Sequence, residues 1–318
     1  MIGTDISHAV RILREGGIVG VPTETVYGLA AVGILEEAVL KIFEAKGRPH
    51  FDPLILHFDG IESARPYLRE VPIWAQLLYQ HFSPGPISFL LEKTALVPDL
   101  VTAGLPRVAI RFPDHAVLQD LLTQLQLPLA APSANPFGYI SPTTAEHVEA
   151  QLGSKIDYIL DGGPCDIGVE STIIGEEEGQ LIVYRKGGIP IEDITAIVGP
   201  VKVMERSSSN PVSPGLLLSH YAPRTPLRVL NEETFSNTNK GNFGYIIFGP
   251  ALEEISMKDQ YLLSPKRDIK EAAKNLFKCM READAGGHDQ IFIHRVPNHG
   301  LGPAINDRIQ RALHSGDL

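Results

Sequence analysis

Apolar residues recur along the first two thirds of the chain in two alternating patterns, short continuous runs and runs with helical spacing. Residues 18–21 form a run typical of a buried strand, and residues 36–46 place Ala38, Ile42 and Ala45 on one helix face. The same patterns predict further helices and strands. The helices are expected at 6–15, 36–46, 73–82, 115–125, 143–152 and 191–198, and the strands at 18–21, 54–58, 86–92, 107–112, 129–131, 157–160, 171–175 and 181–185.

Strands that alternate with helices indicate a layered α/β architecture. The last strands of this region follow one another more closely, which favours a mixed sheet over a wholly parallel one. Residues 205–226 are rich in proline and serine and predict a partly stiff linker, although residues 216–218 and Tyr221 are apolar enough to pack on a domain.

After the linker the pattern resumes, with strands expected at 227–230, 244–248 and 290–294 and helices at 268–283 and 302–313. This is a second, smaller α/β unit, large enough to fold alone. We therefore divide the chain into a first domain (1–204), a linker (205–226) and a C-terminal domain (227–318).

Composition narrows the class of protein. The 318 residues are 43% hydrophobic and 21% charged, which is ordinary for a globular chain and excludes a disordered one. The net charge is −10, and all of the excess acid precedes Thr225: 26 acidic and 16 basic residues up to Arg224, then 12 of each. A long nucleic-acid surface should be basic, so any RNA role is expected to be local or indirect.

Several kinds of site are disfavoured. The sequence has no GxxxxGK[ST] loop, no GxGxxG, no GxSxG and no HExxH, and its two cysteines form no CxxC pair. No apolar run is long enough for a transmembrane helix, and charged residues occupy the N-terminal stretch where a signal peptide would be apolar. We expect a cytoplasmic enzyme or binding protein.

Polar clusters stand at the ends of the predicted strands, where ligands bind in open α/β sheets. Each has an ordinary alternative: Thr23 could cap a helix, Lys46 and Arg48 could balance a helix dipole, and Arg111 could reach solvent. Together the clusters supply hydroxyls and well-separated arginines in an acidic domain, which suits a nucleotide and a small zwitterion. The clusters are PTETVYGL, KGRP, VAIRFP, PSAN, ESTII and YRKGGI.

These six blocks, in this order, resemble those of the YrdC-like L-threonylcarbamoyladenylate synthases. SPGLLLSHYAP and GLGPAINDRIQRAL resemble the longer, two-domain branch of that family. The resemblance implies a YrdC-like mixed twisted sheet followed by a smaller Rossmann-like α/β domain. It also implies a nucleotidyltransferase that makes L-threonylcarbamoyladenylate from L-threonine, bicarbonate and ATP, with Mg²⁺ carried by ATP and pyrophosphate released. The product serves modification of the tRNA adenosine next to the anticodon.

The resemblance also implies the site residues. Those expected to hold threonine are Thr25, His57, Arg111, Ala131 and Ser171. Those expected around ATP are Lys46, Arg48, Asp52, Arg107, Ser133, Asn135, Ser141, Arg185 and Tyr221. Asp52 stands where the family usually has asparagine, and a carboxylate there would repel ATP unless it approaches Mg²⁺ or turns away. Lys186 stands where proline is common.

Three rivals are an RNA-binding module, a carbamoyltransferase of the hydrogenase-maturation type and an ATP-binding regulator. The acidic first domain argues against the first, and the scarcity of cysteine argues against the zinc motifs of the second. Both substrate half-sites argue against the third. Among partners, the family implies transient contact with the threonylcarbamoyl transferase complex, without stable tRNA or membrane binding.

Overall fold

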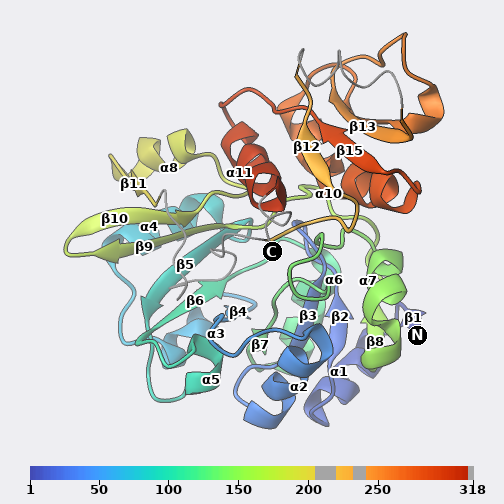
Figure 1. The fold of residues 1–318 in the computed structure, drawn as a ribbon. Helices are drawn as coiled ribbons and strands as arrows, with labels where there is room; N and C mark the ends of the chain where they lie inside the picture. Colours follow the sequence, from blue (N-terminus) through green and yellow to red (C-terminus); the bar gives the residue numbers. More distant parts are fainter. Residues whose placement is uncertain (205–219, 232–240, 314–318) are drawn as a thin grey trace.

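The computed structural model describes residues 1–204, 220–231 and 241–313. Within them, eleven strands form one mixed sheet (Figure 1). From edge to edge the strands are β1 (Ile2–Gly3), β8 (Tyr158–Leu160), β2 (Val19–Val21), β3 (Gly28–Val32), β7 (Leu129–Ala130), β4 (Ile55–His57), β6 (Arg107–Arg111), β5 (Ile87–Glu92), β9 (Thr172–Glu177), β10 (Gln180–Arg185) and β11 (Lys202–Val203). The mixed sheet expected from the sequence is confirmed, since the sheet contains both parallel and antiparallel pairs.

Helices cover both faces around β2 and β3, which explains why these strands are apolar on both sides. Leu29 and Ala31 join a core with α2 and α4, whereas Ala30 and Val32 pack with α1 and α6. The helices of this domain are α1 (Ile6–Arg14), α2 (Glu36–Lys46), α3 (Ile61–Ala64), α4 (Ile73–Phe82), α5 (Asp99–Thr102), α6 (Ala116–Leu125), α7 (Ala145–Leu152) and α8 (Ile191–Val198).

The segment 22–27 differs from one of its predicted alternatives. Thr23 caps no helix, because the chain turns directly into β3, which pairs antiparallel with β2. The Thr23 hydroxyl instead bonds within the turn, donating to the Val26 carbonyl at 2.7 Å. β3 escaped prediction because Gly28–Val32 has only one β-branched residue.

The C-terminal domain is a parallel sheet in the order β12 (Leu227–Val229), β15 (Gln290–Ile293), β13 (Phe243–Phe248) and β14 (Gln260–Ser264). Its helices are α10 (Ile269–Ala285) and α11 (Gly302–Leu313). The second α/β unit is thus confirmed, while β14 was not predicted. No helix in the described ranges is both long and apolar enough to cross a bilayer.

The two domains share one apolar cluster. Val26, Ile140 and Val169 of the first domain pack with Tyr221 and with Phe277 of α10. In Figure 1, α11 lies between the small sheet and the hairpin of β9 and β10. Residues 216–218, expected to pack as an apolar cover, lie outside the described residues.

Candidate functional site

The site lies where β4 and β6 end side by side. These strands are parallel, and their last residues, His57 and Arg111, are direct partners in the sheet. Side chains alternate along a strand, so His57 and Arg111 project from the face opposite to Leu56 and Ile110, which join the helix-covered core. Two buried polar side chains therefore meet where these two strands end.

A cavity opens at this edge, with about 50 Å³ of free space. Its wall combines residues of the β2–β3 turn, of the segments after α2 and after β7, of four strands (β3, β4, β6 and β10) and of the linker. The lining residues are Thr23, Val26, Gly28, Arg48, Ile55, His57, Arg111, Ala131, Pro132, Ser133, Glu170, Arg185, His220 and Tyr221.

Arg111 meets a carboxylate that the sequence reading had not selected. Its Nη2 lies 2.7 Å from Glu24 Oε1, and both side chains are buried. The contact does not have hydrogen-bond geometry: among the described residues, Arg111 Nε and Nη2 and both Glu24 oxygens have no hydrogen-bond partner. Buried polar atoms are normally satisfied, so these atoms are available to a ligand.

A second arginine is fixed by the strands across the cavity. Arg185, at the end of β10, donates from Nη2 to the Ser171 hydroxyl at 2.9 Å and from Nε to the Ser171 carbonyl at 3.0 Å. The Ser171 hydroxyl is also 2.8 Å from that of Ser88, on β5. Burial lowers the pKa of Arg185 to about 10, which leaves it charged at neutral pH.

The turn after α2 holds the other cations. Arg48 Nη2 pairs with Asp52 Oδ2 at 2.9 Å, both fully buried. The carboxylate thus turns to Arg48 and is not part of the cavity wall, one of the two outcomes that the sequence allowed. Lys46 donates to the carbonyls of Ser133 and Asn135, and so fixes the loop after β7.

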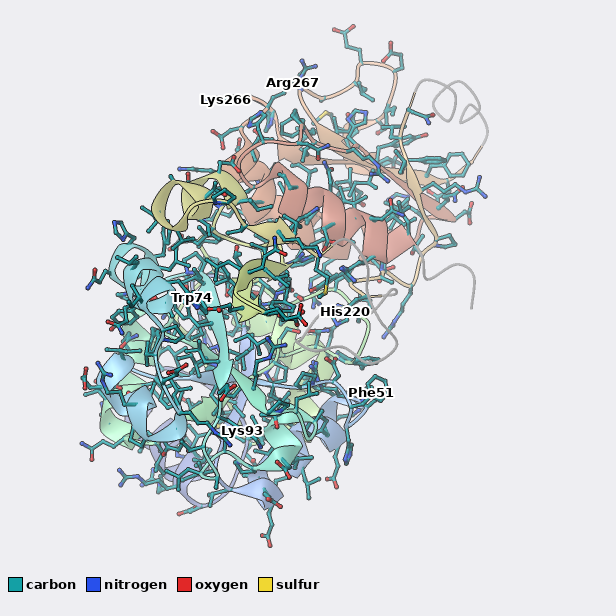
Figure 2. All side chains as sticks on the ribbon, turned by 90° about the vertical axis from the view of Figure 1, so that its left-hand side faces the viewer. Phe51, Trp74, Lys93, His220, Lys266 and Arg267 are labelled. Carbon is teal, nitrogen blue, oxygen red and sulfur yellow. The ribbon has the colours of Figure 1, made fainter. Side chains whose placement is uncertain are left out.

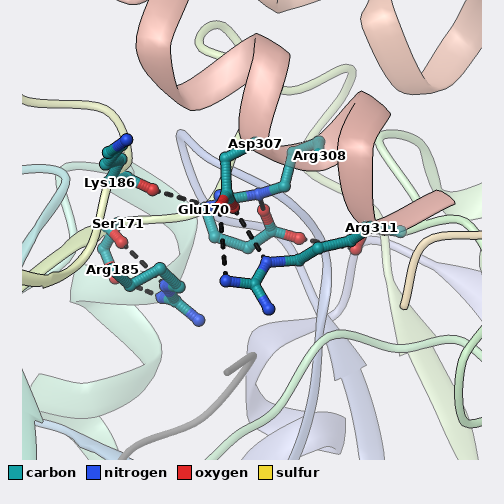
Figure 3. Close-up of polar contacts among 8 residues, drawn as sticks. Glu170, Ser171, Arg185, Lys186, Asp307, Arg308 and Arg311 are labelled. Carbon is teal, nitrogen blue, oxygen red and sulfur yellow. Dashed lines mark hydrogen bonds and ion pairs between the residues drawn. The ribbon is translucent and has the colours of Figure 1, made fainter. Parts of the chain in front are cut away.

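Glu170 joins the cavity to the C-terminal domain. Its Oε1 accepts a hydrogen bond from the Ser141 hydroxyl at 2.6 Å, and its Oε2 accepts one from Arg308 Nε, on α11, at 2.9 Å (Figure 3). Burial alone would raise the pKa of Glu170, but Arg308, Arg185 and these hydrogen bonds outweigh it and hold the pKa below its ordinary value.

His220 and Tyr221 lie over the cavity. Figure 2 places His220 at the level where the two domains meet, far from Lys266 and Arg267 at the outer end of the C-terminal domain. The Tyr221 ring stacks on Phe277 with centroids 5.5 Å apart. Its φ of 65° puts the tyrosine in the left-handed region, which directs the ring into the cavity wall at a cost in backbone strain.

The imidazole of His57 is uncharged in this setting. Burial, together with the charge of Arg111, lowers the pKa of His57 to about 3. Its Nδ1 has no hydrogen-bond partner among the described residues. The cavity therefore offers a neutral imidazole between cations, and the arginines and the lysine named here outnumber the neighbouring carboxylates.

The structure brings most of the expected site residues together. Seven of them line the cavity: Arg48, His57, Arg111, Ala131, Ser133, Arg185 and Tyr221. Five others contact a residue of that wall: Thr25, Lys46, Asp52, Ser141 and Ser171. Asn135 is used locally, since its amide donates to the carbonyls of Pro136 and Tyr139.

Arg107 stands apart from the other expected site residues and does not line the cavity. It begins β6, and Arg111 ends it, so the two residues stand at opposite ends of one strand, about 13 Å apart at 3.3 Å per residue. Arg107 pairs instead with Glu177 at 3.0 Å and donates to the Tyr184 hydroxyl at 3.0 Å. It belongs to a separate surface with Glu176 and Glu178.

Four side chains of the site were missed from the sequence: Glu24, Glu170, His220 and Arg308. Glu24 and Glu170 lie inside quoted blocks, and a carboxylate within an apolar block beside a strand end could have been read as the partner of an arginine. Arg308 carries no such signal, because a helix pattern does not distinguish a buried arginine from a solvated one. The described residues contain no cluster of three His, Cys, Asp or Glu able to hold a metal ion.

Two protein-family models together match most of the chain. The family described as "Telomere recombination" matches residues 11–187, and that described as "Threonylcarbamoyl-AMP synthase, C-terminal domain" matches residues 189–313. Relatives named threonylcarbamoyl-AMP synthase are 37% identical in Pyrococcus abyssi and 37% identical in Bacillus subtilis, each over 96% of this chain and over 93% and 92% of the relative.

Two solved structures are similar to this chain in fold. The crystal structure of Pyrococcus abyssi Sua5 complexed with L-threonine superposes with a TM-score of 0.90 at 36% identity, over 97% of this chain and 94% of that chain. Escherichia coli YciO, at 24% identity and a TM-score of 0.52 over 59% of this chain and 93% of that one, shares the fold of the first domain.

Proposed function

The chain belongs to the threonylcarbamoyl-AMP synthase family, and on that premise we propose that its cavity joins L-threonine, bicarbonate and ATP into threonylcarbamoyl-AMP. One observation carries the proposal: at the end of β6, Nε and Nη2 of buried Arg111 have no hydrogen-bond partner among the described residues. Two further arginines, Arg48 and Arg185, line the same cavity. A carboxylate ligand would satisfy Arg111, and the charges of Arg48 and Arg185 would attract a polyphosphate.

In the proposed complex, Arg111 takes the threonine carboxylate, and Thr25, His57, Ala131 and Ser171 surround the rest of the amino acid. A bidentate guanidinium suits a carboxylate, and the neutral His57 imidazole can accept or donate a hydrogen bond without adding charge. The Pyrococcus abyssi relative was crystallised with L-threonine, which supports this choice of ligand.

ATP takes the opposite side of the cavity. We assign its phosphates to Arg48, Arg185 and Ser133, with Lys46, Asn135 and Ser141 shaping the surrounding backbone and Tyr221 covering the nucleotide. Asp52 acts on ATP only through Arg48, which it orients, and Arg107 is left out because it lies at the far end of β6.

The reaction needs two bond-forming steps. The threonine amine attacks the carbon of bicarbonate and water leaves, which gives a carbamate. A carbamate oxygen then attacks the α-phosphorus of ATP and pyrophosphate leaves. The arginines lower the barrier by position and charge, since negative charge builds up on the phosphate oxygens. Mg²⁺ enters as part of the substrate, bound to the ATP phosphates, and adds further neutralisation there.

Cell location and partners belong to the same proposal. We place the enzyme in the cytoplasm, where its product passes to a threonylcarbamoyl transferase complex through transient contact. A net charge of −10 supports the view that the protein does not itself hold tRNA.

The test is pyrophosphate release from ATP, measured with threonine and bicarbonate supplied separately and together. Release should require both, and mass spectrometry should show threonylcarbamoyl-AMP. Equal release from ATP alone would refute the synthase assignment. Serine and valine are matched controls for threonine, because each keeps the carboxylate but lacks the methyl or the hydroxyl group.

A further inference from the structure

The C-terminal domain places one fully buried arginine against the cavity wall. Arg308, on α11, donates from Nε to Glu170 Oε2 at 2.9 Å and from Nη2 to the Lys186 carbonyl at 2.9 Å (Figure 3). Its guanidinium also lies 5.2 Å from the centre of the Tyr221 ring. One side chain of the second domain therefore contacts two residues that line the cavity of the first.

Stability alone does not account for this arrangement. Taking a guanidinium and a carboxylate out of water is costly, and buried ion pairs are often replaced by apolar residues without loss of stability. Arg308 carries that cost on α11, and Asp307 pairs with it and with Arg311 at 2.8 and 3.0 Å. The position of this network beside the cavity suggests a role in the site.

Glu170 shows what that role is. Its carboxylate lines a cavity that otherwise presents Arg48 and Arg185. An uncompensated negative charge there would repel the phosphates of a nucleotide, and the repulsion would be strong because the surroundings are buried. At the same time Glu170 is the acceptor that fixes the Ser141 hydroxyl. The site can use Glu170 as a hydrogen-bond acceptor only if its charge is balanced.

We propose that Arg308 is a positioning residue that the C-terminal domain supplies to the nucleotide site: it neutralises and orients Glu170, and it supports the ring of Tyr221. The inference rests on the proposed function for the identity of the nucleotide. It gives the second domain a definite task, since ATP binds well only while α11 is docked on the first domain.

Three variants of the full chain test this: Arg308→Gln, Glu170→Gln and the double variant. ATP binding is measured directly by isothermal titration calorimetry without threonine, and the KM values for ATP and threonine by pyrophosphate release. Arg308→Gln should weaken ATP binding at least about tenfold, because it leaves Glu170 charged and unpaired. The double variant should regain most of that loss, since neither charge remains. A purely structural role for Arg308 predicts no such rescue.

Tyr139→Phe is the matched control. It removes another hydrogen bond between the domains, from the Tyr139 hydroxyl to Asp284 Oδ2 at 2.6 Å, but Tyr139 does not line the cavity. This variant should bind ATP as the unaltered protein does. Circular dichroism and thermal unfolding of every variant check that the domains remain folded.

The outcomes separate the possibilities. Unchanged ATP binding by Arg308→Gln, or a double variant as weak as the single one, would overturn the inference. If Arg308→Gln does not fold, Glu170→Gln decides: it should bind ATP at least as tightly as the unaltered protein, and weaker binding would overturn the inference. If the unaltered protein binds ATP but releases no pyrophosphate with threonine and bicarbonate, the proposed function fails while the titrations still decide the role of Arg308.

Discussion

Replacement of Arg111 by alanine should damage the protein in two ways that a second substitution can separate. Arg111 and Glu24 are in contact at 2.7 Å, with side chains only 5% and 7% exposed. Alanine at position 111 removes the group proposed to bind the threonine carboxylate. It also leaves Glu24 as a buried charge without its partner.

The two effects have different sizes. Breaking a buried ion pair by removing one member lowers the free energy of unfolding by about 3–5 kcal/mol. Losing a hydrogen bond to a charged ligand is worth about 1.5–3 kcal/mol. At about 1.4 kcal/mol per tenfold, the KM for threonine should rise roughly 10- to 150-fold.

Arg111→Ala combined with Glu24→Gln distinguishes the effects. The double variant has no buried charge at this point, so chemical denaturation should show most of the lost stability restored. The KM for threonine should stay high, because the carboxylate still lacks its guanidinium. If the KM for threonine recovers together with stability, or does not change in the single variant, then Arg111 does not bind threonine and the proposed orientation of the substrates is refuted.

The remaining predictions concern three other positions. Arg107→Ala should leave the KM for ATP within about twofold in the pyrophosphate assay, since Arg107 bonds with Glu177 and Tyr184 away from the cavity; a larger rise would return it to the site. Tyr221→Ala should lower the free energy of unfolding by about 3–5 kcal/mol, measured by denaturation, and weaken ATP binding in calorimetry; full ATP affinity would exclude a covering role. The pKa of His57 is lowered to about 3, so between that value and the ordinary 6.5 the unfolded chain binds a proton that the folded chain does not, and stability falls as pH falls. From pH 7 to pH 5 His57→Asn should therefore lose about 2 kcal/mol less than the unaltered protein, and equal losses would show that His57 titrates normally.

Strand ends were the part of the site that sequence could predict. A strand of apolar residues that stops at a polar side chain places that side chain at the sheet edge, whatever the details of packing. His57, Arg111 and Arg185 follow this rule, and the structure gathers all three around one cavity. Arg107 shows the limit of the rule, because it lies on the same strand as Arg111 but at its other end, and it does not line the cavity.

The ion-pair and hydrogen-bond partners of the site residues were less predictable, because such pairs join segments that are far apart in the chain. Glu24 reaches Arg111 across 87 positions of sequence, and Ser141 reaches Glu170 across 29. Neither sequence separation is one at which a helix or a hairpin would bring two side chains into contact. Only the folded chain brings the loop after β2 to the end of β6, and the loop that holds Ser141 to Glu170.

Arg308 could not have been recognised as a site residue from the sequence, and in the role proposed for it the second domain contributes to the cavity of the first. Its helix shows an apolar face with Ile305 and Ile309, so the pattern predicts only that α11 packs on something. The arginine lies on that buried face, where a solvated role is impossible, and the acceptor it meets is a carboxylate beside the predicted phosphate site. A first domain without α11 would therefore contain Glu170 in a cationic cavity with one of its two hydrogen-bond partners missing. In this protein the second domain completes the electrostatics of the first.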